Sequence, residues 1–284
     1  LIGLSILLYP MVSDAWNRYR DSLLISNYSS SVSSDDNSEK IDSMWKAAQE
    51  YNEQIKQESV PDAFSVRDGQ TDSTYESLLN LNGDGMMGYV EIPVIDVSIP
   101  IYHYTTDESL EKGAGHLFGS SLPVGGKSTH CILSAHRGLP SAKLFTDLNL
   151  VEEGDVFYLH VLGKTLAYEV DQILTVLPEQ TESLGITDGD DYVTLVTCTP
   201  YAVNTHRLLV RGIRTKYVEE EVTKNDETIP QKLAVVDPKR VLAGGAAALV
   251  ILILLIYLIV RRKDKKRRMK QLSERKEEAE SDEK

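Results

Sequence analysis

From Gly88 to Arg214, the apolar residues follow the short-period pattern that is typical of β-strands. The strand-like runs are GYVEIPVIDVSIPIY, HCILSAH, DVFYLHVLGKTLAYEVDQILTV, YVTLVTC and HRLLVRGIR. Glycine, proline, aspartate and asparagine separate these runs, as they do in turns between strands. No long helical pattern alternates with the strands, so we predict an all-β domain over residues 80–217, a barrel or a sandwich.

The preceding residues, 21–79, favour one helix between two irregular stretches. The helix should bury a single apolar face, made of Ile41, Met44, Trp45, Ala48 and Ile55. Before it, SSSVSSDDNS (residues 29–38) is expected to form a polar linker. After it, SVPDAFSVRDGQTDSTYES (residues 59–77) is expected to be irregular surface chain.

Two apolar runs point to a membrane. VLAGGAAALVILILLIYLIV (residues 241–260) carries no charge and can cross a bilayer as a helix. The basic run RRKDKKRR follows it, and the positive-inside rule places that run in the cytoplasm. We therefore expect an acidic linker over residues 218–238, a transmembrane helix over residues 239–260 and a cytoplasmic tail over residues 261–284, with the β domain outside the cell. A buried core helix is the alternative, although such helices rarely end in a basic block.

The first run, LIGLSILLY, is too short to span a membrane alone. We interpret residues 1–20 as the remnant of a signal sequence or of a first membrane segment.

The charge of the chain argues against nucleic-acid binding. The 284 residues carry a formal net charge of −13, yet the tail after Val260 holds 11 Lys/Arg against 7 Asp/Glu, so the rest carries −17. Nucleic-acid binding needs a basic face, which so acidic a body does not favour.

The chain has only two cysteines, Cys131 and Cys198. They could form a disulfide in an extracellular domain. However, Cys131 and His136 are five residues apart, so strand alternation sends them to opposite faces. If His136 shares a site with Cys198, Cys131 points away from that site and acts as a small buried hydrophobe.

Cys198 ends one apolar run, and Arg207 lies on the next run after a short turn. Antiparallel neighbours would bring the two side chains close together, and a reactive thiolate needs a nearby cation or histidine. His136, at a strand end before a glycine turn, and His206, beside Arg207, are rival bases. A structural role is expected for the other histidines, His103, His116, His130 and His160. Cys198 itself could also be merely buried, as free cysteines usually are.

We expect neither a metal nor a cofactor. NLNGDGMMGYVE (residues 80–91) approaches a calcium-loop pattern, but it starts with Asn and lacks a flanking helix pair, and NGDG is an ordinary turn signal. The cysteines do not have zinc-ligand spacing.

TLVTCTP, NTHRLLVRG and the upstream SAHRG together resemble the sortases, the membrane-anchored cysteine transpeptidases of Gram-positive bacteria. The resemblance implies an eight-stranded β-barrel. It implies that Cys198 is the nucleophile, His136 the acid/base and Arg207 the stabiliser of the oxyanion or substrate. It further implies cleavage of an LPXTG-like sorting signal between Thr and Gly, a thioester intermediate and its resolution by an amine.

The C-terminal membrane helix and the N-terminal extension resemble those of class C sortases, which polymerise pilins. In these enzymes a lid with an Asp-Pro-aromatic motif covers the site, and here the matching residues are Asp62, Ala63 and Phe64 within residues 61–67. We expect Asp62 to pair weakly with Arg207 as an exposed ion pair, and Phe64 to shield the Cys198 sulfur. An ordinary linker is the alternative for this segment.

The resemblance to class C implies that a lysine of the next pilin resolves the thioester. Two other functions stay open: attachment of surface proteins to cell-wall peptidoglycan, and a catalytically dead, membrane-tethered binding module. A papain-like hydrolase fits the chemistry but not the barrel pattern. The oligomeric state is not predicted.

Overall fold

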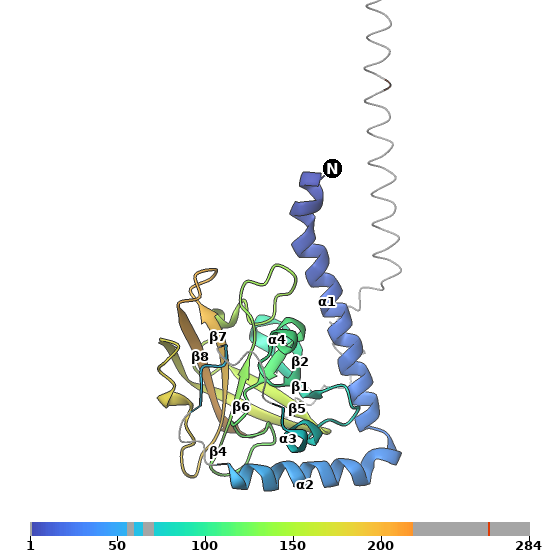
Figure 1. Ribbon diagram of the computed structural model, residues 1–284, viewed down its shortest axis with the longest axis vertical. Coiled ribbons are helices and arrows are strands. Elements are labelled where there is room, and N and C mark those ends of the chain that lie inside the picture. The colour runs from blue at the N-terminus through green and yellow to red at the C-terminus, as the bar shows by residue number, and fades with distance from the viewer. Residues whose placement is uncertain (1, 56–59, 65–70, 218–260, 262–284) are drawn as a thin grey trace, which may run out of the picture. The chain divides into compact units, whose positions relative to one another are not determined.

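The computed structural model describes residues 2–55, 60–64, 71–217 and 261. The chain divides into two compact units, Leu1–Asn225 and Asp226–Lys284. Eight strands of the first unit form a closed barrel in the order β1-β2-β3-β4-β7-β8-β6-β5 (Figure 1). The strands are β1 Met86–Ile92, β2 Val97–His103, β3 Ala114–His116, β4 Thr129–Ser134, β5 Val156–Val161, β6 Lys164–Val176, β7 Asp191–Thr199 and β8 His206–Thr215. The predicted eight-stranded barrel is confirmed.

Strand β7 is apolar on both faces because it is buried on both sides. It runs parallel to β4 and antiparallel to β8. Val193 and Leu195 join the main hydrophobic core, whereas Val196 and Cys198 join a second, smaller apolar cluster. The alternation of side chains along one strand therefore separates the structural core from the face that carries Cys198.

Helices α1 (Ile2–Val32) and α2 (Ser38–Gln54) lie against the barrel, α1 along its side and α2 across one end (Figure 1). Tyr28 fixes α1, because its buried hydroxyl donates to the Met87 carbonyl at 3.0 Å and accepts from the Leu162 amide at 2.9 Å. The predicted apolar face of α2 is confirmed for four of its residues: Ala48 is buried, and Ile41, Met44 and Trp45 pack against the core. The fifth, Ile55, lies just past the end of α2.

The predicted polar linker over residues 29–38 is wrong. Helix α1 continues to Val32 and α2 begins at Ser38, so only a short connection with a 3₁₀ turn, Asp35–Asn37, separates them. Serine costs little in a helix, and the docking of Tyr28 holds this end of α1 on the barrel. The expected boundary after residue 20 also falls inside α1.

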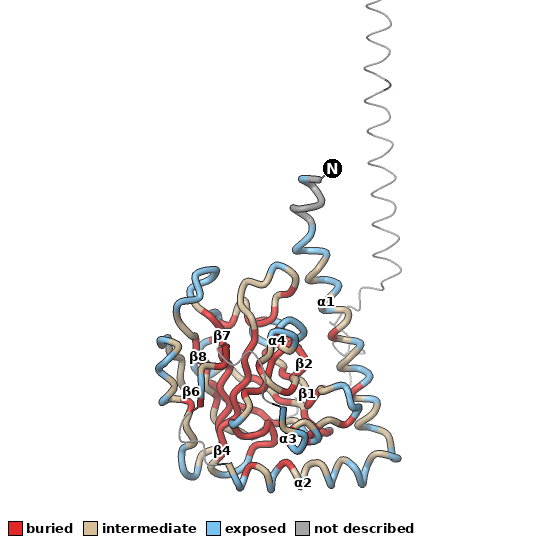
Figure 2. Tube along the Cα trace, in the orientation of Figure 1, coloured by how far each residue is buried: buried red, intermediate tan, exposed pale blue. Residues whose placement is uncertain are grey.

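The stretch over residues 59–77 is not simply irregular surface chain. Residues 73–77 form a short helix, α3 (Ser73–Ser77), and Asp72 caps it by accepting from the amides of Thr74 and Tyr75 at 2.9 and 3.0 Å. Tyr75 is fully buried in the core. Figure 2 shows the burial concentrated in the strands, while α1 and α2 expose much of their surface. Strand β3 and the helix α4 (Asp107–Lys112) were not predicted.

The transmembrane helix expected over residues 239–260 lies outside the described residues. Within the part of the chain that the structure does describe, no helix combines the length and the apolar character that a membrane crossing requires.

Candidate active site

Cys198 lies near the end of β7; Arg207 is on the neighbouring strand β8, and His136 follows the end of the other neighbouring strand, β4, by two residues. In the antiparallel ladder with β8, Cys198 stands directly opposite Arg207. In the parallel ladder with β4, Ser134 pairs with Val196, and the Ala135 amide continues the register by donating to the Val196 carbonyl at 3.2 Å. Extended by two residues past the end of β4, the same register would bring His136 level with Cys198. The strand pairing thus brings the three residues of the sequence prediction to one end of the sheet.

The two cysteines lie in different environments. Both are free thiols, so the disulfide that composition allowed does not form. Cys131 belongs to the main core, and burial raises the pKa of its thiol well above the usual value. Cys198, 9% exposed, belongs to the second cluster. The prediction that Cys131 points away from the site is confirmed.

Arg207 forms a two-pronged ion pair with Asp62. The Arg207 Nε donates to Oδ1 at 2.7 Å and the second terminal nitrogen donates to Oδ2 at 2.8 Å. Each side chain is only 11% exposed, so the expectation of an exposed pair is wrong. The hydrogen bonds to Asp62 raise the pKa of Arg207; burial opposes that rise, and the nearby Cys198 adds to it.

The Phe64 ring contacts both Arg207 and His136. Its ring centroid lies 5.1 Å from the guanidinium carbon of Arg207 and 6.0 Å from the centroid of the His136 ring. Val60, Ala63 and Phe64 are buried in the cluster that contains Cys198. We call residues 60–64 the cover segment. Ala63, which stands where the lid motif has proline, is 2% exposed, so the cover segment packs closely without the proline.

The rival base His206 lies elsewhere. It pairs with Thr199 across the β7–β8 ladder, one position beyond Cys198, so its side chain belongs to the opposite face. Its Nδ1 lies 2.9 Å from the Thr205 hydroxyl.

The remaining four histidines have polar partners within the fold, as expected. His103 bonds the carbonyls of Gly85 and Leu78, and His160 contacts Glu91 and Thr165. Burial lowers the pKa of His116 and of His130 to about 4, so both are neutral at physiological pH.

Sequence reasoning missed Arg137, which follows His136 directly. Its guanidinium donates from Nε to the Thr146 carbonyl at 3.1 Å and from its terminal nitrogens to Thr199 Oγ1 at 2.9 Å and Asn149 Oδ1 at 2.7 Å. The only signal in the sequence is a cation next to the candidate acid/base.

Comparison with known proteins identifies the family. The sortase domain family matches residues 90–215. Sortase A of Streptococcus agalactiae serotype III is 30% identical over 178 residues, which cover 61% of this chain and 70% of that protein. The chain belongs to the sortase family. It is therefore a cysteine transpeptidase, an enzyme of acyl transfer.

Solved structures narrow the resemblance to class C. Sortase C of Streptococcus pneumoniae is 45% identical, with a TM-score of 0.64 over 68% of this chain and 97% of that one. Sortase C-1 of Actinomyces oris is also 45% identical, with a TM-score of 0.60 over 63% of this chain and 99% of that one. The structural neighbours of this sortase are thus class C sortases.

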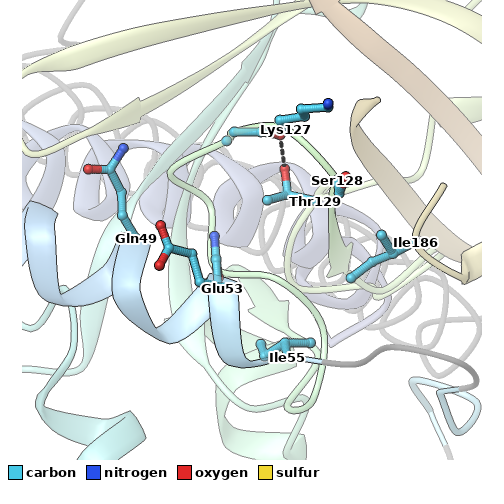
Figure 3. A pocket seen from close by; sticks show the side chains of 10 residues that line it. Gln49, Glu53, Ile55, Lys127, Ser128, Thr129 and Ile186 are labelled. Atoms are coloured by element: carbon cyan, nitrogen blue, oxygen red, sulfur yellow. Dashed lines mark hydrogen bonds between the residues drawn. The ribbon is translucent and has the colours of Figure 1, made fainter. Parts of the chain in front are cut away.

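A cavity of about 600 Å³ lies at the other end of β4 from the Cys198 site of this sortase (Figure 3). It lies between the last turns of α2 and the loop before β4. Two of its polar side chains bond the protein: Asn52 bonds the backbone of Leu122, and Thr129 donates to the Gly126 carbonyl at 2.7 Å. None of the predicted site residues lines this cavity.

The calcium-like loop of this sortase acts as a turn. Asn80 Oδ1 accepts from the Gly85 amide at 3.0 Å, and Asp84 Oδ1 accepts from the Met86 amide at 3.1 Å. Glu91 lies in β1 and contacts His160. These side chains therefore order the entry into β1.

Proposed function

We propose that this sortase cleaves an LPXTG-like sorting signal and joins the released acyl group to a lysine of another pilin subunit. The observation that carries the proposal is the position of Cys198, which stands opposite Arg207 on β8 and shares an apolar cluster with Phe64, whose ring contacts His136 just past the end of β4. The class C neighbours support the pilin substrate, since the description of the Streptococcus pneumoniae enzyme speaks of pilin substrate specificity.

The proposed reaction has two acyl transfers. The Cys198 thiolate attacks the carbonyl carbon of the signal's threonine, and Arg207 stabilises the oxyanion that forms. The bond to glycine then breaks, His136 gives its proton to the leaving amine, and a thioester stays on Cys198. In the second transfer the lysine amine attacks the thioester, His136 takes the amine's proton, and the thiolate leaves as the new amide forms.

The cover segment must move before this reaction begins. Asp62 accepts hydrogen bonds from the Nε and from one terminal nitrogen of Arg207. The other terminal nitrogen of Arg207 donates to the carbonyls of Asn204 and His206 at 3.3 and 3.2 Å. Phe64 fills the apolar cluster beside Cys198. We therefore assign the cover segment the role of a lid, which a bound sorting signal displaces.

The membrane placement is also part of the proposal. Residues 239–260 would anchor the enzyme, residues 261–284 would lie in the cytoplasm, and the barrel would face outward toward its pilin substrates.

Mass spectrometry tests the chemistry. The enzyme is incubated with an LPXTG-type peptide, and an acyl adduct on Cys198 is expected, followed by a cross-linked product when a pilin with a free lysine is added. Cys198→Ala should abolish both species, and Cys131→Ala should abolish neither. Cleavage by Cys198→Ala would refute the mechanism, and loss of activity in Cys131→Ala alone would assign it to the other thiol.

The same assay decides the acceptor. The curated relatives at 28–30% identity over 178 residues are named Sortase A rather than C, which favours a cell-wall peptide amine as the second candidate. Preferential transfer to such a peptide when it competes with pilin would support anchoring. An intact fold that gives no thioester would indicate a binding module.

A further inference from the structure

We propose that Arg137 is a positioning residue that fixes His136 relative to Cys198. The proposal rests on the catalytic roles proposed above and adds the device that holds the pair together.

The backbone ladder between β4 and β7 ends before the site. Its last links are the bond from the Ala135 amide to the Val196 carbonyl at 3.2 Å and the bond from Thr197 Oγ1 to the Ala135 carbonyl at 2.7 Å. The His136 carbonyl instead accepts from the Phe145 amide at 3.1 Å, so the chain has already turned toward the following loop. The last pair of the ladder therefore lies two residues before His136 and Cys198.

The bond from Arg137 to Thr199 is the next link along the same register. Ser134 and Val196 are 62 positions apart, and so are Arg137 and Thr199. Each member of this bond lies one residue beyond a proposed catalytic residue, Arg137 after His136 and Thr199 after Cys198. The bond therefore bridges the two strand ends just past the reacting pair, beyond Ser134 and Val196, the last pair of the β4–β7 ladder.

The rest of the guanidinium anchors this link to the loop after His136. The Nε donates to the Thr146 carbonyl, and a terminal nitrogen donates to Asn149 Oδ1. The turn is fastened a second time, because the Gly138 amide donates to Thr146 Oγ1 at 3.2 Å. A planar guanidinium holds its donors in a fixed fork, so it can join β7 to the stretch after His136 in one defined geometry, which the rotating ammonium of a lysine does not provide.

The chemical type of the acceptors indicates what the hydrogen bonds of Arg137 do. The three groups that its donors reach are a carbonyl, a hydroxyl and an amide oxygen, all of them neutral. By contrast, Arg211 and Arg207 each pair with a carboxylate. The acceptors of Arg137 thus supply directed hydrogen bonds on two segments, β7 and the stretch after His136, and do not neutralise its charge.

The test is single-turnover acylation by an LPXTG-type peptide, with the rate constant measured per titrated Cys198 thiol. Arg137→Gln should lower this rate constant by about 10- to 100-fold, because misplacement by about 1 Å can cost that much, with little change in KM. Arg137→Lys should recover only part of the rate. Thr199→Val, which removes one acceptor at constant shape, should slow acylation in the same way, and the double variant should lose less than the product of the two single effects.

Arg211→Gln is the matched control. Arg211 lies on β8, the neighbour of β7, and the change breaks its two hydrogen bonds of 3.0 and 2.7 Å to the Asp171 carboxylate. This control should keep the wild-type rate constant. Arg137→Gln and Thr199→Val could instead show fewer titratable Cys198 thiols and an unchanged rate constant per thiol. That result would reduce Arg137 to a structural role and overturn the proposal. That result would leave the proposed function intact as long as Cys198→Ala is inactive, whereas activity in Cys198→Ala would refute the function first.

Discussion

The two cysteine thiols differ in their chemistry because their side chains lie on different faces of the sheet. Cys131 and Cys198 lie on neighbouring parallel strands of one sheet, yet Cys131 faces the main core and Cys198 faces the cluster beside Arg207. Burial without a cation raises the pKa of Cys131 and keeps it inert. Cys198 has a cation across the ladder that can stabilise negative charge on sulfur or on a carbonyl oxygen.

The alternation of side chains along the strands also predicts how much activity each histidine variant should lose. His136→Ala and Arg207→Ala should each lower kcat/KM for peptide cleavage by about 10²- to 10⁴-fold, as losses of acid–base and oxyanion groups do. His206→Ala should cost far less, because His206 pairs with Thr199 on the other face. Cleavage of a fluorogenic LPXTG-type peptide measures all three variants. A greater loss for His206→Ala than for His136→Ala would exchange their proposed roles.

The residue-scale predictions from sequence succeeded where contacts are local. Cys198 and Arg207 are joined by a short turn, so antiparallel pairing alone indicates their contact. The burial of the Asp62–Arg207 pair was not predictable, because 145 positions separate its members and only packing decides how much water reaches them. Arg137 was missed for a related reason, since one of its partners is 62 positions away.

At the scale of elements, the cover segment combines two kinds of contact. Burying the Phe64 ring contributes about 1.5–3 kcal/mol. An exposed ion pair would add about 0–1 kcal/mol, but the pair with Asp62 is two-pronged and part-buried, with 11% of each side chain exposed. Removing one partner of a fully buried pair costs about 3–5 kcal/mol, so the part-buried pair lies between these limits. The charge contact is therefore at least comparable to the aromatic one in its importance to closure.

This comparison predicts the behaviour of lid variants. Asp62→Ala should speed alkylation of Cys198 by a small thiol reagent at least as much as Phe64→Ala does, and the double variant should react fastest. Alkylation rates on the folded enzyme give the measurement. The matched control is Asp171→Ala, which removes the carboxylate from the similar pair with Arg211 and should leave the rate unchanged. A double variant that reacts at the parental rate would show that residues 61–67 are only a linker.

The elements differ in how far their sequences predict them. Most strands of the barrel were evident, since alternation and turn residues are local signals. Strand β3 has only three residues, too few for a periodic pattern. The serine-rich end of α1 resembles a linker, but tertiary packing of Tyr28 overrides that composition. Residues 65–67 of the predicted lid lie outside the described residues.

At the scale of the whole molecule, charge is segregated along the chain. The basic tail after Val260 contrasts with a body of net charge −17. A polybasic segment next to an apolar span favours the cytoplasmic side, where anionic lipids attract it. An enzyme that acts on exported proteins needs its barrel on the other side, so the charge pattern and the proposed function agree.

Thiol labelling on intact protoplasts tests this topology. The full chain is prepared as Cys198→Ala, which removes the more accessible native thiol, while Cys131 stays buried at 3% exposure. In that background Ser281→Cys should resist a membrane-impermeant thiol reagent until the membrane is permeabilised. Glu153→Cys, at an exposed position of the barrel, should label at once and serves as the external control. Labelling of Ser281→Cys on intact protoplasts, with a cytoplasmic marker protein unlabelled, would place the tail outside and overturn the proposed orientation, whereas protection of both sites would place the barrel inside.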